Sequence, residues 1–214
     1  MKVVLNTLAA YSDERGNSIS VGSGGSVVKS TVTFNENGSK LVVGRNVKFS
    51  VCSIELGKNA TLIIGDDSKI RGTISVGFGS SVIIGSDVTF VSNMKVRAVE
   101  STSITIGNDC LFAAGVTIRT NDGHPIYDAY TRERINSSKS VVVGEHVWLG
   151  EDVVVLKGVE IGAASIVAGR SVVTKNIPKN SVAAGAPAKV VRTGVTWEHN
   201  SQTFSPQYYL QEEV

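Results

Sequence analysis

Residues 143–178 read VGEHVW LGEDVV VLKGVE IGAASI VAGRSV VTKNIP, which divides into six blocks of six residues. Each block opens on an aliphatic residue and carries a small or medium-sized residue at its fifth position. Neither an α-helix, with about 3.6 residues per turn, nor an alternating strand repeats in this way. A chain that turns a corner every sixth residue does, and three such sides close one triangular coil. The stretch therefore predicts a solenoid of short parallel strands, with an interior filled by Val143, Leu149, Val155, Ile161, Val167 and Val173.

The same register continues upstream, with slips of a few residues between groups that we interpret as insertions at corners. Val43 and Phe49 form the earliest regular pair, and residues 1–40 are predicted to form irregular capping coils. Between these segments and the quoted stretch, the aliphatic or aromatic first positions are Ile64, Ile70, Val76, Val82, Ile84, Phe90, Val96, Ile106, Phe112 and Ile118.

Within a block, glycine often follows the aliphatic residue, as at Gly144 and Gly162, where we expect a tight bend. His146 is the fourth residue of its block and is expected to face outward from a flat side. Trp148 is the sixth residue of the same block, and we expect this large aromatic side chain at a corner, outside the lumen.

The composition is that of one globular domain, which we place at residues 1–192, because 42% of the 214 residues are hydrophobic. The formal net charge of +2 favours neither nucleic acid nor an anionic membrane as a partner, so only local clusters of charge are informative. No apolar run is long enough to span a bilayer or to form a convincing signal peptide, which predicts a cytoplasmic protein. Cys52 and Cys110 are predicted to be buried thiols that form no bridge.

The largest break in the repeat is residues 119–140, RTNDGHPIYDAYTRERINSSKS. Solenoids concentrate insertions on one face, which is often the binding face. This insertion holds His124, and the following Pro125 restricts the backbone of His124 to extended conformations. Loop position alone leaves two interpretations open, a catalytic histidine or a solvated surface histidine.

Four segments resemble a known family: residues 106–119 (IGNDCLFAAGVTIR), 121–128 (NDGHPIYD), 143–162 and 173–192 (VTKNIPKNSVAAGAPAKVVR). They are similar to the hexapeptide-repeat acyltransferases, and the resemblance covers about residues 41–192. The shorter motifs HPIYD, ERIN and HVWLG look most similar to bacterial enzymes that O-acetylate surface polysaccharides, including the sialic acid capsule O-acetyltransferases. The fold implied is all-β, a left-handed parallel β-helix of three-sided hexapeptide coils, with a catalytic loop insertion at residues 119–140 and a C-terminal tail at residues 193–214.

The resemblance implies that His124 is the general base, which takes a proton from a sugar hydroxyl and returns it to the departing thiolate. An imidazole, with an ordinary pKa of about 6.5, suits this role, and such catalysis contributes about 10²- to 10⁴-fold in rate. Trp148 matches the tryptophan that shapes the acetyl-CoA end of the site in the similar sialate enzymes, so it is placed among both catalytic and cofactor-binding residues. Packing between subunits is the alternative role of Trp148. Asp122, Asp128 and Glu133 are left open as the residue that orients His124.

Acetyl-CoA is the implied co-substrate, with no metal, and the implied assembly is a homotrimer with active sites between subunits and a carbohydrate acceptor. The pantetheine arm would lie on backbone near Gly150, Ala168 and Gly169. The residues that match nucleotide- and phosphate-holding positions are Thr174, Lys175, Lys189 and Arg192. Lys175, Lys189 and Arg192 belong to a basic cluster with Arg170 and Lys179, which could alternatively keep the coil end soluble.

The tail at residues 193–214 is expected to cover the open end of the last coil. His146 and His199 are expected to be surface residues, and with His124 they lack the spacing of a zinc site of the γ-carbonic anhydrase type. A purely structural solenoid would lack the long loop, and residues 1–40 are too short for the α/β domain of a sugar nucleotidyltransferase. Among acyltransferases, a small-sugar or antibiotic acceptor is the alternative to a surface polysaccharide.

Overall fold

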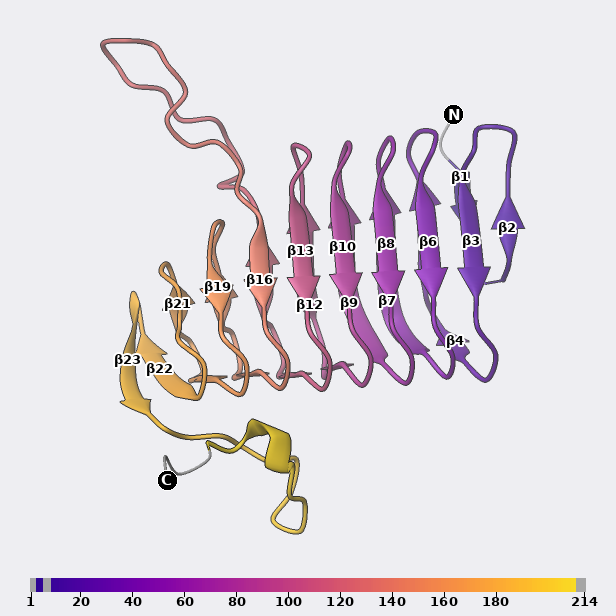
Figure 1. The fold of residues 1–214 in the computed structure, drawn as a ribbon. Helices are drawn as coiled ribbons and strands as arrows, with labels where there is room; N and C mark the ends of the chain where they lie inside the picture. The colour runs from indigo at the N-terminus through magenta and orange to yellow at the C-terminus, as the bar shows by residue number, and fades with distance from the viewer. Residues whose placement is uncertain (1–2, 6–8, 211–214) are drawn as a thin grey trace.

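The computed structural model describes residues 3–5 and 9–210, which form a column of stacked three-sided coils (Figure 1). The chain descends on the front side of the column and ascends behind it while it advances toward the C-terminus, so the helix is left-handed (Figure 1). Neighbouring coils are joined by parallel strand pairs in register. The predicted left-handed parallel β-helix is confirmed.

Each side of the coil, called here a face, holds one strand per coil. Face 1 contains β4 (Ser26–Val28), the first parts of β7 (Lys48–Leu56) and β9 (Lys69–Val76), β11 (Thr89–Phe90), β14 (Leu111–Phe112), β17 (Trp148–Leu149), β20 (Ile166–Val167) and β22 (Ser181–Gly185). Face 2 contains β5 (Thr31–Phe34), the second parts of β7 and β9, β12 (Met94–Ala98), β15 (Thr117–Arg119), β18 (Val154–Val155) and β21 (Val172–Val173). Face 3 contains β3 (Ser18–Val21), β6 (Lys40–Val43), β8 (Thr61–Ile64), β10 (Ser81–Ile84), β13 (Ser103–Ile106), β16 (Val141–Val143) and β19 (Glu160–Ile161).

Three further strands are antiparallel: β1 (Val3–Leu5) pairs with β5, β2 (Tyr11–Ser12) with β3, and β23 (Ala188–Thr193) with β22. The helical part of the described chain is one 3-10 turn, η1 (Pro206–Tyr208). No helix in residues 3–5 and 9–210 is long and apolar enough to cross a membrane. The corners between faces are called corner 1–2, corner 2–3 and corner 3–1.

The lumen of the column is filled as the period of six predicts. All six first positions of the quoted stretch are buried, with exposed fractions of 1% or less. The fifth positions are buried as well, and polar ones such as Ser165 are satisfied by backbone carbonyls. The lumen also holds the thiols of Cys52 and Cys110, which are free as predicted, and burial raises the pKa of each to about 12.

The period of six predicts the sixth position of each block at a corner and the fourth position on a flat side, and the structure shows the reverse. The sixth and first positions form the strand, so Trp148 lies on the flat of face 1 and points outward with 39% exposure. The fourth position lies at the corner in the left-handed backbone conformation, and His146 (φ 53°) occupies it at corner 3–1. Hydrophobic period alone does not show where the backbone turns, because the turn depends on this local conformation.

The glycines after the aliphatic residues serve close stacking of coils instead of a tight bend. A Cβ atom on Gly144 would lie 2.7 Å from the backbone nitrogen of Ala163 in the next coil, and one on Gly162 would lie 2.3 Å from that of Lys179. Such distances exclude a side chain unless the coils separate.

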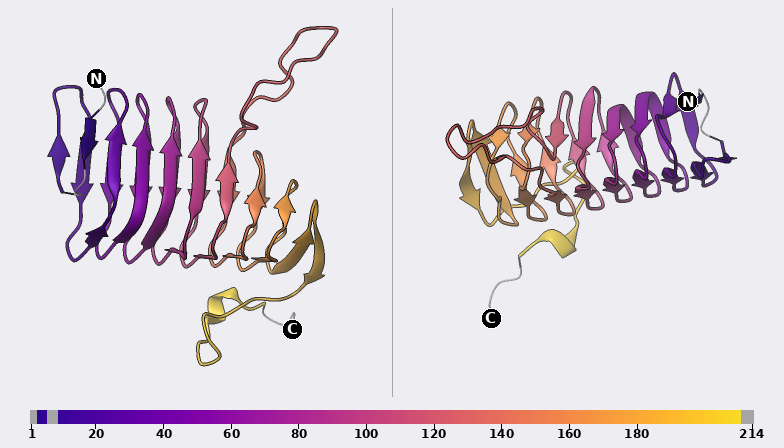
Figure 2. Two further views of the ribbon diagram at one scale, coloured as in Figure 1. Left: turned by 180° about the vertical axis from the view of Figure 1, so that it is seen from behind. Right: turned by 90° about the horizontal axis from the view of Figure 1, so that it is seen from above.

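The slips in register come from longer strands and not from insertions at corners. In the N-terminal coils strands on faces 2 and 3 commonly bury two or more residues, such as Ile74 and Val76 in β9 or Val82 and Ile84 in β10. In the C-terminal coils β18 buries Val155 alone. The column therefore narrows toward its C-terminal end (Figures 1 and 2).

Parallel pairing also extends further toward the N-terminus than the sequence pattern indicated. Residues Ser18–Val21 of β3 pair in register with Lys40–Val43 of β6, and β2 then covers the edge of β3. Residues 1–2 and 6–8 of the expected capping segment lie outside the described residues.

Candidate active site

His124 lies on the loop that follows Arg119 at the end of β15, leaves the column at corner 2–3 and returns to β16 at Val141 (Figure 1). Tyr127 and Arg134 form an antiparallel bridge, which gives the outer part of the loop the shape of a hairpin. The His124 side chain is exposed, and no group in the described part of the chain hydrogen-bonds its ring. The imidazole is therefore free to meet a substrate.

Asn136 fixes the backbone around His124, a role that the sequence did not reveal. Asn136 is buried, with an exposed fraction of 8%, whereas residues 122–135 of the same loop are mostly exposed. Its Oδ1 accepts a hydrogen bond from the backbone N–H of Ile126 at 2.6 Å, and its Nδ2 donates to the carbonyl of His124 and to Asp122 Oδ2, each at 2.9 Å. The only signal in the sequence was the motif ERIN, which ends on this residue.

Ion pairs attach the loop to the rigid coils. Lys157 Nζ lies 2.5 Å from Asp122 Oδ2 and 2.9 Å from the carbonyl of Asn136. Arg134 pairs with Glu100 at 2.9 Å on the opposite strand of the loop. The hydrogen bond from Lys157 lowers the pKa of Asp122, and that from Arg134 lowers the pKa of Glu100, so both carboxylates are charged near neutral pH.

None of the three carboxylates left open by the sequence hydrogen-bonds the His124 ring. Asp122 is engaged by Lys157 and Asn136. Asp128 Oδ1 accepts backbone N–H groups of its own turn, from Tyr130 at 2.9 Å and Thr131 at 2.8 Å. Orientation of His124 in this chain comes through its backbone, held by Asn136.

The small residues predicted to meet the pantetheine arm stack on each other where corner 1–2 begins. Gly150 donates its N–H to the carbonyl of Val167, and Ala168 donates to that of Ala183, each at 2.9 Å. A Cβ on Gly150 would lie 2.6 Å from the nitrogen of Gly169, so the corner exposes backbone and little side chain.

The predicted phosphate-binding residues are all exposed at the C-terminal end of the column. Lys189 and Arg192 lie on β23, paired with Ala184 and Val182 of β22. Thr174 and Lys175 follow β21, at the start of corner 2–3. The structure thus brings Lys189 beside the column of Gly150 and Ala168 and places Thr174 and Lys175 one corner further along the coil.

His124 and Trp148 are not brought together within one chain. Trp148 lies on face 1. In a three-sided coil, face 1 lies opposite corner 2–3. The His124 loop leaves the column at corner 2–3 and projects away from it (Figures 1 and 2). The two predicted catalytic residues therefore belong to opposite sides of the chain.

The family model described as bacterial transferase hexapeptide (six repeats) matches residues 140–175. The crystal structure of the polySia-specific acetyltransferase NeuO matches this fold with a TM-score of 0.77 at 33% identity, over 89% of this chain and 92% of that one. The chain belongs to the hexapeptide-repeat transferase family.

Two relatives in this family carry different acceptors in their names. The polysialic acid O-acetyltransferase of Escherichia coli O1:K1 is 37% identical over 134 residues, which are 63% of this chain and 43% of that protein. The galactoside O-acetyltransferase of Escherichia coli strain K12 is 34% identical over 129 residues, 60% of this chain and 62% of that protein. The chain thus spans about half the length of the curated relatives that it matches.

In this hexapeptide-repeat protein His146 is fully buried, which corrects its expected surface position. The C-terminal tail covers it: the rings of Trp197 and Tyr208 stack on the imidazole with centroid distances of 4.4 and 4.1 Å. Its Nδ1 lies 2.7 Å from Asp109 Oδ2 and its Nε2 lies 2.7 Å from the carbonyl of Trp197. Both ring nitrogens of the buried imidazole therefore have a hydrogen-bonding partner.

The tail runs along corner 3–1 and does not cover the open end of the last coil. Asn180 Nδ2 donates to the carbonyls of Val195 and Tyr208, at 3.1 and 2.8 Å. Trp197 lies with its ring centroid 6.0 Å from that of Trp148, so the tail also packs beside the predicted catalytic face. At the C-terminal end β23 instead pairs with β22. Residues 211–214 of the tail lie outside the described residues.

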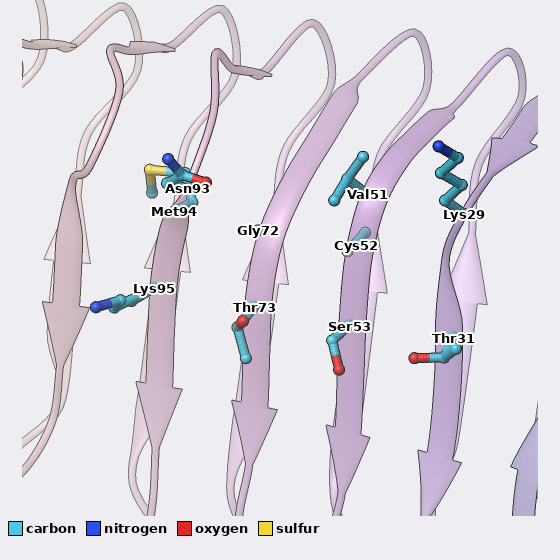
Figure 3. A pocket seen from close by; sticks show the side chains of 10 residues that line it. All are labelled: Lys29, Thr31, Val51, Cys52, Ser53, Gly72, Thr73, Asn93, Met94 and Lys95. Carbon is cyan, nitrogen blue, oxygen red and sulfur yellow. The ribbon is translucent and has the colours of Figure 1, made fainter.

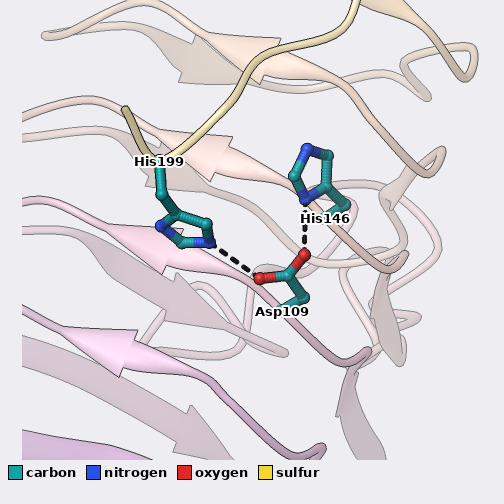
Figure 4. Close-up of side chains that lie close together, drawn as sticks. All are labelled: Asp109, His146 and His199. Atoms are coloured by element: carbon teal, nitrogen blue, oxygen red, sulfur yellow. Dashed lines mark hydrogen bonds and ion pairs between the residues drawn. The ribbon is translucent and has the colours of Figure 1, made fainter. Parts of the chain in front are cut away.

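His199 is partly exposed, and its Nε2 lies 2.7 Å from Asp109 Oδ1, so one carboxylate bridges two imidazoles (Figure 4). The three potential metal-ligand atoms of Asp109, His146 and His199 lie within 4.8 Å of one another, although the sequence spacing of the histidines suggested no such meeting. The fold brings them together because His146 and Asp109 occupy equivalent corner positions in successive coils, while His199 arrives on the tail. His124 belongs to a different corner and is not part of this group. The absence of a metal stays a prediction.

Trp197→Ala is expected to free the tail from corner 3–1 while the coils stay folded. Removal of a buried tryptophan costs about 3–5 kcal/mol, which here falls on the docking of the tail. Limited proteolysis should then cleave residues 194–210 faster than in the wild type, with an unchanged coil fragment. Phe204→Ala is the matched control, because Phe204 lies on the same tail with 68% exposure. Equal cleavage of the Trp197 variant and the wild type would contradict this account.

Proposed function

We propose that this protein transfers an acetyl group from acetyl-CoA to a sugar hydroxyl of a bacterial surface polysaccharide. The observation that supports this most is an exposed imidazole, His124, fixed by Asn136 on a braced loop, in a chain that follows the fold of a polySia-specific acetyltransferase over nearly its full length. The cytoplasmic location expected from the sequence is part of the same proposal.

His124 serves as the general base. Its neutral ring accepts the hydroxyl proton while the sugar oxygen attacks the thioester carbonyl, which forms a C–O bond and a tetrahedral intermediate. Collapse of that intermediate breaks the C–S bond, and the proton on the imidazole passes to the departing thiolate. This mechanism requires no covalent acyl-enzyme intermediate. The exposure of the His124 ring suits direct contact with the acceptor.

Coenzyme A fits the exposed backbone of corner 1–2. The amide-rich pantetheine arm would lie along Gly150, Ala168 and Gly169, where the largest side chain is the methyl group of Ala168. Lys189 and Arg192 on β23, with Thr174 and Lys175 at the neighbouring corner, would hold the phosphates and nucleotide.

The site is complete only when two chains meet, and we propose the predicted homotrimer. His124 of one chain would reach face 1 and corner 1–2 of its neighbour, where Trp148 and the acetyl-CoA residues lie. This arrangement is supported by the position of the loop and of Trp148 on opposite sides of the column (Figure 1). Cyclic symmetry gives every chain the same two roles.

A small sugar or antibiotic acceptor is the second candidate, favoured by the similarity to the galactoside O-acetyltransferase. Release of free thiol from acetyl-CoA, measured with surface polysaccharides, monosaccharides and amines, separates the two candidates. Turnover confined to monosaccharides or amines would overturn the polysaccharide proposal.

In that assay His124→Ala is expected to lose at least about 10²-fold in kcat, following the usual contribution of a general base. Binding of CoA, measured by calorimetry, should be unchanged because His124 contacts the acceptor. The exposed loop residue Tyr130, with 95% exposure, supplies the control Tyr130→Ala. Near-normal turnover of the His124 variant would remove this residue from the mechanism.

Asn136→Ala keeps the imidazole but removes the hydrogen bonds of Asn136 to the His124 carbonyl, to Asp122 and to the N–H of Ile126, which hold the loop around His124. A misplacement of about 1 Å can cost about 10²-fold in rate, so kcat should fall by about 10- to 10²-fold while KM for acetyl-CoA stays the same. The neighbouring exposed Ser137→Ala is the control. A wild-type kcat in Asn136→Ala would show that the loop keeps its geometry without this side chain.

Mixed assemblies test the shared site. His124→Ala and Trp148→Ala chains, each impaired alone, should regain about a quarter of the wild-type rate when they are co-expressed, because random mixing pairs an intact His124 with an intact Trp148 in that share of cyclic interfaces. Mixing His124→Ala chains with the double variant should restore nothing. Failure of the first mixture, with mixed trimers confirmed by mass spectrometry, would place both residues in one chain's site.

A further inference from the structure

The charges of this chain are segregated, which the net charge of +2 conceals. Corner 3–1 carries a stack of acids, Asp67, Asp87 and Asp109, and burial together with this proximity raises the pKa of Asp87. Face 2 carries bases, with Lys95 and Arg97 exposed on β12. A surface arranged in this way selects ligands by the sign of their charge.

Among the described residues, the bases of face 2 form no ion pair, although the charge of Arg119 contributes to the lowered pKa of the nearby Asp122. Elsewhere Arg45, Arg134 and Lys157 are each paired with a carboxylate. In contrast, within residues 3–5 and 9–210, no ion pair forms at Lys29 of corner 1–2 or at Lys95, Arg97 and Arg119 of face 2. Arg119 also buries its Nε atom without a hydrogen-bond partner in that part of the chain.

A groove of about 530 Å³ lies between these cations at corner 1–2 of the N-terminal coils (Figure 3). It exists because β7 and β9 run from face 1 to face 2 without a break, bending at Val51 and Gly72, whereas later coils have a longer turn at this corner. Lys29 lies at one end of the groove and Lys95 at the other (Figure 3).

The floor of the groove offers hydroxyl groups at regular spacing. Thr31, Ser53 and Thr73 occupy the same register position in successive coils, and Lys95 continues their line. Four coils stacked about 4.8 Å apart give the line a length of about 14 Å. This spacing suits an extended ligand with repeated polar groups better than a single sugar ring.

The groove continues toward the His124 loop. A second hollow of about 300 Å³ shares Thr73 and Lys95 with the first and adds Glu55, Ser75 and Arg97 to its lining. Arg97 pairs in register with Arg119, the last residue before the loop. The line of cations therefore ends at the base of the segment that presents the catalytic base.

We propose that this groove binds the acceptor as an extended, carboxylate-bearing polysaccharide, which rests on the proposed function and names the substrate class of its acceptor side. Lys29, Lys95 and Arg97 pair with carboxylates along the chain, while the hydroxyls of Thr31, Ser53 and Thr73 bond the sugar hydroxyls. Arg119 holds the sugar unit that His124 deprotonates. A neutral polysaccharide leaves these cations unpaired and binds more weakly.

The test compares Lys95→Glu/Arg97→Glu with the control Lys40→Glu, since Lys40 is exposed on β6 of face 3, away from the groove. Polysialic acid is the carboxylated probe and dextran the neutral one, and binding is measured by calorimetry at low and high salt. Wild type and Lys40→Glu should bind polysialic acid, and the double variant should bind it about tenfold more weakly or worse. Binding of polysialic acid should weaken as the salt concentration rises. Dextran should bind the wild type and both variants more weakly than polysialic acid binds the wild type.

Equal affinity of wild type and double variant for polysialic acid, or no binding by the wild type, overturns the proposal. If the double variant melts early, Lys95→Gln/Arg97→Gln replaces it, with the same expected direction. The thiol-release assay separates this proposal from the proposed function. Groove-dependent binding of polysialic acid with no acetylation of any polysaccharide refutes the function alone. Acetylation of polysialic acid by the double variant with an unchanged KM for polysialic acid refutes only the proposed role of the groove.

Discussion

The stacking of each coil on the previous one in register is the constraint on which the whole structure depends. Backbone hydrogen bonds of 2.7–3.2 Å join successive coils on all three faces and at the corners. This ladder leaves no room for a Cβ atom at positions such as Gly107, where one would lie 2.6 Å from the next coil. Because the coils cannot shift relative to one another, residues at equivalent positions form straight lines along the column. Each coil therefore contributes one residue to each such line, and a functional surface is built from these lines.

This constraint also explains how much the sequence could predict. The hydrophobic period of six identifies the lumen because burial is the dominant favourable term in folding and each inward position must be apolar. It does not identify the corners, because a left-handed residue such as His146 or Asp152 is set by local backbone conformation and by contacts with the next coil. For the same reason the longer N-terminal strands looked like slips in register, although both of their inward residues, such as Ile104 and Ile106, are buried.

In the candidate site, too, the sequence located residues that belong to local patterns and missed those that depend on the folded structure. His124 and the small residues of corner 1–2 could be located from motifs, because each belongs to a short local pattern. Asn136 and the covering of His146 could not. The partners of Asn136 lie elsewhere in an irregular loop without periodicity, and those of His146 lie in the preceding coil and on the C-terminal tail. A loop without an apolar core is held by hydrogen bonds and ion pairs, and the buried amide of Asn136 satisfies three partners at once. Such a network has no periodicity from which it could be read.

The two sides of the column divide the proposed reaction between them. The acceptor groove runs along face 2 and ends at Arg119, so acceptor and catalytic base are presented by one chain. In the proposed homotrimer, the small residues of corner 1–2 in the C-terminal coils, with Trp148 on face 1, would present the thioester from the neighbouring chain. Since the groove occupies the wide N-terminal coils and the thioester site the narrow C-terminal ones, a long polymer and the acetyl donor approach from opposite ends of the column. In this proposal, the taper that comes from lengthened N-terminal strands would keep the two substrates apart until they meet at the His124 loop.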